Sequence, residues 1–217
     1  MRLHLHEWGD PGAPPVVCLH GVTGRGALFE RLAVEALPEF RVLAPDLRGH
    51  GRSGWEPPWR LQTHVADVVE TAEAAGVERA AWIGHSFGGR LVIELAAAEP
   101  ERVDRAVLLD PAIRVRPDRA LLLAEGTRAS EEYCRSAVVA IFGELAAWGP
   151  APEDLAGPLL LVVGADESVV GPRQLERYRR GLGRRLRVTP VPGGHDVLLD
   201  AFAETAAATR AFLGEAA

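Results

Sequence analysis

Residues 79–98, RAAWIGHSFGGRLVIELAAA, constrain the fold of this chain more than any other stretch. An apolar run at 80–83 is followed by Gly84-His85-Ser86-Phe87-Gly88 and then by apolar residues at helical spacing. This pattern predicts a strand, a tight turn and a helix. Gly84 and Gly88 lack a Cβ, so strand and helix can approach each other closely and leave the Ser86 hydroxyl exposed at the turn.

The size and charge of the chain limit its architecture and its partners. With 217 residues, 47% of them hydrophobic, it can bury one sizeable core, and we expect a single domain over 1–217. A net charge of −6 argues against nucleic acid or an anionic membrane as the main partner, because either would favour a basic face.

The cysteines and the apolar segments predict a cytoplasmic protein. Cys18 and Cys134 show no metal-ligand or redox spacing, and we expect two reduced thiols. The first ten residues carry charges and histidines where a signal peptide would need an apolar core. No apolar stretch approaches the length of a membrane span.

Strand patterns and helix patterns alternate along the chain, which predicts an α/β fold with a mostly parallel sheet covered by helices on both faces. Strands are expected at 2–8, 15–19, 41–44, 80–83, 105–109, 159–163 and 186–191, and helices at 27–36, 61–75, 120–125, 131–145 and 202–212. In the first strand His4 and His6 alternate with leucines, so we expect surface histidines and no ligands.

Side chains that could perform catalysis follow the ends of several strands. A serine is a nucleophile only when a base accepts its proton and a carboxylate orients that base. His195 lies on a glycine-rich turn after the last strand and is the predicted base for Ser86. Sites in such sheets gather at the carboxyl ends of the strands, where His20, Ser86, Glu167 and His195 all lie.

The motif Gly84-His85-Ser86-Phe87-Gly88 resembles the nucleophile elbow of the α/β-hydrolase family. The sequence D-L-R-G-H-G-x-S at 46–53 is similar to a second signature of that family, a loop that buttresses the site. The resemblance implies that the backbone N–H groups of Val22 and Phe87 form the oxyanion hole, and that His20 orders a loop.

The identity of the acid is left open by the sequence. The family position three residues after the glycine that ends the strand is occupied by Glu167, which we favour. Asp is commoner at that position, and Asp166 is adjacent. Some relatives place the acid after the preceding strand, which here would be Asp110.

The resemblance covers nearly the whole chain, in a trimmed form. The family inserts a lid between the strands that end near 110 and begin near 159, and the segment 112–157 is short for it. We therefore expect a reduced lid, an open, shallow site with loose specificity and little room for the usual first strand. Trp55 and Trp59 could wall an acyl pocket or simply pack, and Arg25 is a candidate substrate contact.

The predicted function is hydrolysis of carboxylic esters through an acyl-enzyme intermediate, with a small-molecule ester as partner and neither a metal nor an organic cofactor. On the same fold, a C–C bond hydrolase, a lactonase or a lyase of the menaquinone-pathway type are alternatives. Their acidic substrates would need cations, for which Arg25, Arg48 and Arg90 are available. A small-molecule receptor with little turnover is the alternative outside enzymes, and the oligomeric state is open.

Overall fold

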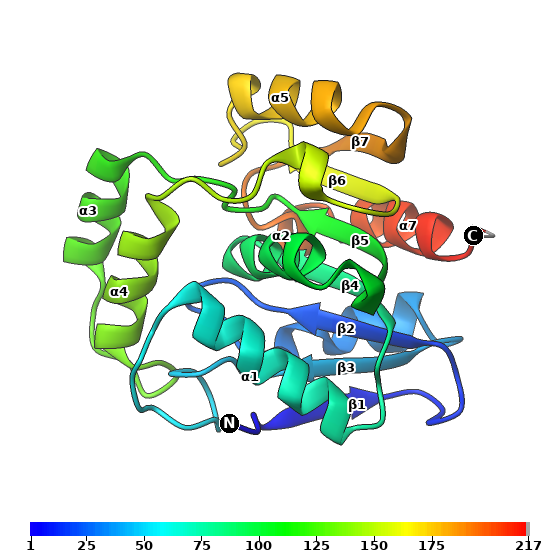
Figure 1. Ribbon diagram of the computed structural model, residues 1–217, viewed down its shortest axis with the longest axis horizontal. Coiled ribbons are helices and arrows are strands. Elements are labelled where there is room, and N and C mark those ends of the chain that lie inside the picture. The colour runs from blue at the N-terminus through cyan, green and yellow to red at the C-terminus, as the bar shows by residue number, and fades with distance from the viewer. Residues whose placement is uncertain (216–217) are drawn as a thin grey trace.

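The computed structural model describes residues 1–215 of the 217-residue chain. Its core is a seven-stranded sheet in the order β1-β3-β2-β4-β5-β6-β7 (Figure 1). All neighbouring strands are parallel except β1 and β3, which run antiparallel. The strands are β1 Leu5–Trp8, β2 Pro15–Leu19, β3 Arg41–Pro45, β4 Ala80–His85, β5 Val103–Leu109, β6 Leu159–Gly164 and β7 Leu186–Val191.

Helices cover both faces of this sheet (Figure 1). One face carries α1 Leu61–Ala74, α2 Phe87–Ala98 and α5 Pro172–Leu182, and the other carries the short turns Gly26–Phe29 and Leu32–Ala36 together with α6 Val197–Asp200 and α7 Phe202–Leu213. Short 3-10 turns lie at Pro100–Arg102, Pro152–Asp154 and Gly183–Arg185. The predicted α/β class is confirmed.

The buried strands divide their side chains between two cores. In β2, Val17 and Leu19 pack with α1 and α2, whereas Val16 and Cys18 pack with the helices of the opposite face. Residues along β6 alternate in the same way. Because successive side chains of a strand point to opposite faces, a continuous apolar run is what a strand buried on both sides requires.

The segment after β5 contains two helices, α3 Pro117–Gly126 and α4 Arg135–Leu145, which pack against each other beside the sheet (Figure 1). The first turn predicted for the second helix is not helical. The backbone of Tyr133 bridges to His50, and the N–H of Cys134 donates to the Gly49 carbonyl, 2.7 Å away. These tertiary contacts hold residues 133–134 against the 46–53 loop, so the helix begins only at Arg135.

Other departures from the sequence prediction are local. The helix expected at 27–36 is two short turns, one 3-10 and one π. Helix α5 was not predicted, because only Tyr178 and Leu182 of its eleven residues are buried and its apolar stripe is correspondingly thin.

The cysteines and the lengths of the helices concern the expected cellular environment of the chain. Cys18 is buried and Cys134 half-buried, and both are free thiols. Among the helices of residues 1–215, none is both long enough and apolar enough to cross a bilayer.

Candidate active site

Ser86 lies at the turn between β4 and α2 with a strained backbone, at φ 53° and ψ −112°. Such a positive φ is rare for a residue with a side chain and persists only when the surroundings enforce it. A Cβ on Gly84 would clash with the backbone of Gly88, and one on Gly88 with the Leu19 carbonyl oxygen. The two glycines therefore let the turn close, which is the reason the motif predicts it.

His195 meets Ser86 from the loop that follows β7. Its Nε2 lies 2.9 Å from the Ser86 Oγ. The loop is fixed by Asp166, whose backbone N–H donates to the Gly193 carbonyl and whose carboxylate accepts the Gly193 N–H, both at 3.0 Å. The His195 side chain is 32% exposed, so water can reach the imidazole. The predicted pairing of these two residues is present in the structure.

The carboxylate against His195 belongs to Asp110, at the end of β5. Its Oδ2 lies 2.6 Å from His195 Nδ1, and its side chain is fully buried. Asp110 has a positive φ of 41°. The Ser168 hydroxyl donates to Oδ1, and the Val169 N–H donates to Oδ2 at 3.0 Å.

This arrangement corrects the order in which the sequence ranked the three carboxylates. Glu167 was favoured, but its side chain is 75% exposed and points to Arg119, 3.7 Å away. Asp166 holds the His195 loop without contacting the imidazole. The chain after β6 bends so that Ser168, and not the residue before it, faces Asp110. The strand-end position that the sequence placed third is the one that meets His195.

Of the two predicted oxyanion donors, Phe87 directly follows Ser86, and Val22 lies in the loop after β2, whose Gly21 approaches Ser86. Within the described residues, neither the Val22 nor the Phe87 backbone N–H donates a hydrogen bond. Phe87 is the first residue of α2, where an N–H has no partner within the helix. The Val22 carbonyl contacts Nε2 of His50, and this contact orients the loop that carries Val22. Both N–H groups are therefore without an acceptor in the part of the chain that the structure describes.

His20 orders the loops as expected. Its Nδ1 lies 2.8 Å from the Gly21 carbonyl, and its Nε2 accepts the Leu47 N–H at 2.9 Å. Burial, reinforced by His50 nearby, lowers the pKa of His20 to about 3. The imidazole is consequently neutral at physiological pH, as an acceptor nitrogen requires, and joins the loops after β2 and β3.

His85 lies directly against His195, the candidate base. Its ring centroid is 4.9 Å from that of His195, and its Nε2 lies 3.1 Å from the His195 carbonyl oxygen. Burial lowers the pKa of His85, and the adjacent His195 lowers it further. A neutral His85 places no positive charge beside the imidazole of His195.

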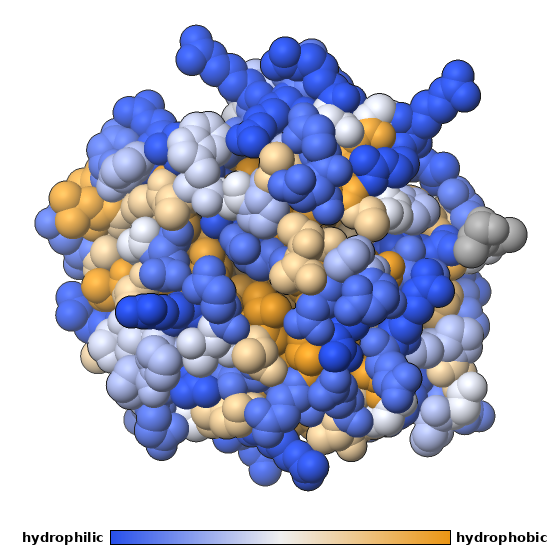
Figure 2. All heavy atoms as spheres, viewed as in Figure 1, coloured by the Kyte–Doolittle hydropathy of each residue, from blue (hydrophilic) through white to orange (hydrophobic). Residues whose placement is uncertain are grey.

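A cavity of about 1640 Å³ opens over Ser86 and His195. Its walls come from the loop after β2, helices α3 and α4, and the loop between β6 and α5. The apolar lining residues include Leu28, Leu122, Leu123, Phe142, Trp148 and Leu198. Leu122, Leu123 and Trp148 are also among the exposed large apolar side chains. Figure 2 shows apolar atoms gathered over α3.

The predicted substrate contacts lie outside this cavity. Trp55 donates its indole N–H to the Gly51 carbonyl, Trp59 packs beside Gly49, and Arg25 pairs with Glu132 at the surface. The cavity is lined instead by Tyr133, Phe142 and Trp148, which the sequence analysis did not select. All three lie in the lid segment, where the sequence gives no sign of which residues face Ser86.

Two arginines considered for acidic substrates are structural. Arg48 pairs with the buried Asp67 at 2.6 Å. Arg90 is buried, pairs with Glu94 at 2.8 Å and donates to the Ile113 carbonyl at 2.7 Å. Neither lines the cavity.

Comparisons with known proteins agree with this fold. The model of the alpha/beta hydrolase fold family matches residues 14–131, more than half of the chain. Lipase LipV of Mycobacterium tuberculosis is 40% identical over 131 residues, 60% of this chain and 50% of that protein. Esterase YbfF of Escherichia coli is 33% identical over 96 residues, 44% of this chain and 38% of that protein.

Solved structures extend the likeness in fold to nearly the full length. The enol-lactonase of Burkholderia xenovorans superposes with a TM-score of 0.87 at 18% identity and covers 98% of this chain and 96% of its own. The chain spans about half the length of the curated relatives it matches first. The elbow at Ser86, the sheet order and the family match together place this chain in the α/β-hydrolase family.

Proposed function

We propose that this protein is a serine hydrolase that cleaves carboxylic esters through an acyl-enzyme intermediate. The observation that carries the proposal is the continuous path from Ser86 Oγ to His195 Nε2, 2.9 Å, and from His195 Nδ1 to Asp110 Oδ2, 2.6 Å. Nucleophile, base and orienting acid are thus within hydrogen-bonding reach at the floor of a cavity. Lipase and esterase relatives support the reaction class.

In the first half-reaction Ser86 Oγ attacks the ester carbonyl carbon while His195 Nε2 accepts the hydroxyl proton. Asp110 holds the other ring nitrogen and stabilises the imidazolium that forms. The carbonyl oxygen becomes negative and is bound by the N–H groups of Val22 and Phe87, an interaction worth several kcal/mol in the transition state. The imidazolium then protonates the leaving alcohol.

In the second half-reaction water attacks the acyl-enzyme. His195 accepts a proton from that water, and the same oxyanion donors stabilise the second tetrahedral intermediate. Collapse releases the carboxylic acid and returns the proton to Ser86. The apolar walls from α3 and α4 would hold the acyl chain, which favours short to medium acyl groups without strict selection.

Turnover of p-nitrophenyl acetate and butyrate by wild type and Ser86→Ala tests the proposal. We expect steady turnover in wild type and a loss of about 10³-fold or more in kcat in the variant, because the covalent route disappears. A single slow turnover in wild type would support a small-molecule receptor. Equal steady rates in both proteins would refute a serine nucleophile.

The charges around the cavity favour a second candidate, the hydrolysis of esters or lactones that also carry an anionic group. Six arginines line the cavity, Arg31, Arg114, Arg116, Arg119, Arg128 and Arg173, against two acidic residues, Glu167 and Asp196. The whole chain, in contrast, has a net charge of −6. A cationic cavity in an acidic protein attracts anionic substrates.

Monomethyl succinate and methyl butyrate, hydrolysed by wild type, Arg173→Ala and Arg179→Ala, distinguish the two candidates. Arg173 lines the cavity, whereas Arg179 lies on the same helix and does not. If anionic esters are preferred, kcat/KM for the succinate ester falls severalfold only in Arg173→Ala. If Arg173→Ala lowers kcat/KM equally for both esters, the preference for anionic esters is refuted and hydrolysis of neutral esters remains the proposed function.

A further inference from the structure

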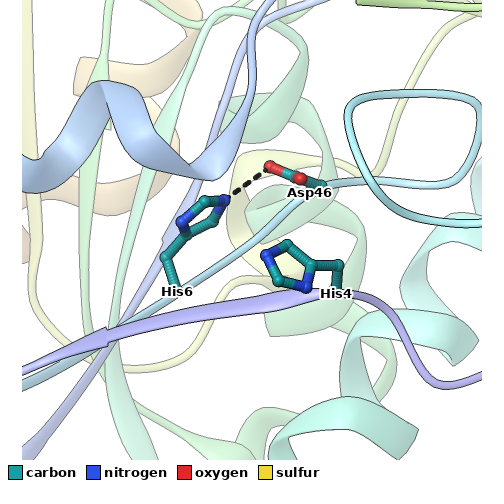
Figure 3. A group of neighbouring side chains, drawn as sticks. All are labelled: His4, His6 and Asp46. Carbon is teal, nitrogen blue, oxygen red and sulfur yellow. Dashed lines mark hydrogen bonds and ion pairs between the residues drawn. The ribbon is translucent and has the colours of Figure 1, made fainter.

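His4, His6 and Asp46 meet at the antiparallel edge of the sheet (Figure 3). His6 lies in β1 and His4 directly precedes that strand, two residues earlier, so their side chains share one face. The Asp46 N–H donates to the His4 carbonyl at 2.8 Å, which continues the antiparallel register past the pair His6 and Ala44. Cross-strand neighbours also share a face, so the register itself brings the three side chains together.

We propose that these three residues bind a divalent transition-metal ion, with Zn²⁺ as the best match. One ligand atom from each residue lies within 4.8 Å of the others, and His6 Nε2 is 3.1 Å from Asp46 Oδ1. Ligands about 2.0–2.1 Å from a tetrahedral Zn²⁺ are roughly 3.3 Å apart. The ligand atoms of His6 and Asp46 are therefore already spaced for coordination. Two imidazoles and one carboxylate form a typical ligand set for this metal.

The third ligand, His4, can move into place without breaking a hydrogen bond of its ring, which packs edge-on against His6 with ring centroids 4.8 Å apart. The His4 ring makes no hydrogen bond within the described residues, while its backbone N–H is anchored to Ser53 Oγ at 2.8 Å. A side-chain rotation on a fixed backbone therefore closes the remaining gap. His4 and His6 are half-buried, so one side stays open to solvent and a water can complete the coordination.

The carboxylate is already held as metal ligands usually are. Asp46 is buried, its Oδ1 accepts the Gly26 N–H at 2.8 Å and its Oδ2 accepts the Arg52 N–H at 2.9 Å. Hydrogen bonds of this kind fix a ligand's orientation and tune the metal.

One charged neighbour opposes a cation at this site. Arg52 adjoins the cluster, because its backbone N–H donates to Asp46 Oδ2 at 2.9 Å. Its positive charge would repel a bound metal ion, so we expect removal of the guanidinium to favour metal binding.

The site is separate from the proposed catalysis. None of its three residues lines the cavity over Ser86. A bound ion would instead join β1 to the loops at Gly26 and Arg52, through the hydrogen bonds that Asp46 makes to both. We therefore expect the metal to raise the thermal stability of the chain by binding only the folded state, with hydrolysis unchanged.

Calorimetric titration of the full chain with Zn²⁺, and with Co²⁺ followed by its visible spectrum, tests the site. The variants are His4→Ala, Arg52→Gln and the matched control His195→Ala, which removes a partly exposed histidine elsewhere. We expect one equivalent bound by wild type, binding at least tenfold weaker in His4→Ala, unchanged in His195→Ala and tighter in Arg52→Gln. The thermal shift caused by Zn²⁺ should follow the same order.

Equal Zn²⁺ affinity in wild type and His4→Ala would overturn the proposal, as would binding lost only in His195→Ala. Absence of one-equivalent binding to a folded wild type would overturn it as well. His6→Ala is a weaker test on its own, because it removes the hydrogen bond to Asp46, and circular dichroism must first show that it folds.

Discussion

Asp110 contributes the carboxylate that contacts the imidazole of His195, 2.6 Å away. It is fully buried, and its carboxylate oxygens contact His195, the Ser168 hydroxyl and the Val169 N–H. A buried carboxylate is tolerated when each of its lone pairs faces a donor. The donors from the loop after β6 therefore stabilise the charge that orients His195, and this loop contributes to the site through Ser168 instead of Glu167.

Substituting the three carboxylates singly tests this assignment. We expect Asp110→Asn to lower kcat for p-nitrophenyl butyrate by about 10³–10⁴-fold, because the amide no longer fixes the tautomer of His195. Glu167→Gln, an exposed change on the neighbouring loop, is the control and should leave kcat within about twofold.

Asp166→Asn should have an intermediate effect, since it weakens the hold on the His195 loop without touching the imidazole. A large loss in Glu167→Gln together with a small one in Asp110→Asn would contradict the geometry. Circular dichroism of each variant separates lost chemistry from lost folding.

At the scale of the element, helix α3 contributes the wall of the cavity. Only Ala120 of this helix is buried, and Leu121, Leu122 and Leu123 are 60%, 67% and 39% exposed. Such a run of apolar side chains on a surface helix usually marks a binding surface. Leu122 and Leu123 face the cavity, whereas Leu121 does not line it.

Serine substitutions in α3 should therefore change the preference for acyl length. In the double variant Leu122→Ser, Leu123→Ser, we expect KM for p-nitrophenyl octanoate to rise severalfold, because apolar contact with the longer chain is lost. KM for the acetate should change little. Leu121→Ser on the same helix is the matched control, and an equal rise of KM there would mean that α3 acts through its fold and not through contact.

At the scale of the whole molecule, buried histidines make the stability depend on pH. His64 is fully buried between α1 and α2, and neither ring nitrogen has a hydrogen-bonding partner in the described residues. Burial lowers its pKa to about 3, from an ordinary value of 6.5. The unfolded chain therefore binds a proton that the folded chain excludes, and stability falls as the pH drops from 6.5 toward 3.

Replacing His64 with leucine removes this linkage. The Phe87 ring packs edge-on against His64 at 5.2 Å, so an apolar side chain of similar size suits the position. We expect His64→Leu to raise Tm slightly at pH 8 and more at pH 5, since each pH unit below 6.5 costs wild type roughly 1.4 kcal/mol at this group. His20, also buried with a lowered pKa, keeps part of the acid sensitivity in both proteins.

Thermal melts across this pH range provide the measurement. A difference between variant and wild type that stays constant from pH 8 to pH 5 would show that the pKa of His64 is the same in the folded and unfolded chains. A stability advantage of the variant over wild type that shrinks as the pH falls from 8 to 5 would contradict a buried neutral His64 as the cause.

The sequence by itself determined the class of the fold and the centre of the site. Apolar runs of strand length alternate with amphipathic helices, and this local periodicity holds whatever the rest of the chain does. The turn at Ser86 was equally predictable, because only glycine at 84 and 88 fits beside the neighbouring backbone. His195 followed from its place after the last strand. These features depend on residues close to one another in sequence.

The tertiary structure alone decided which distant side chains meet. Asp110 reaches His195 because β5 lies next to β4 in the sheet and the loop after β6 turns Ser168 toward it. The cavity wall depends on how α3 and α4 pack beside the sheet, which no local pattern encodes. The sequence predicts surface positions for His4 and His6, whereas the register of β1 with β3 places Asp46 beside them. Contacts across the sheet arise from strand order and register, and these are properties of the whole fold.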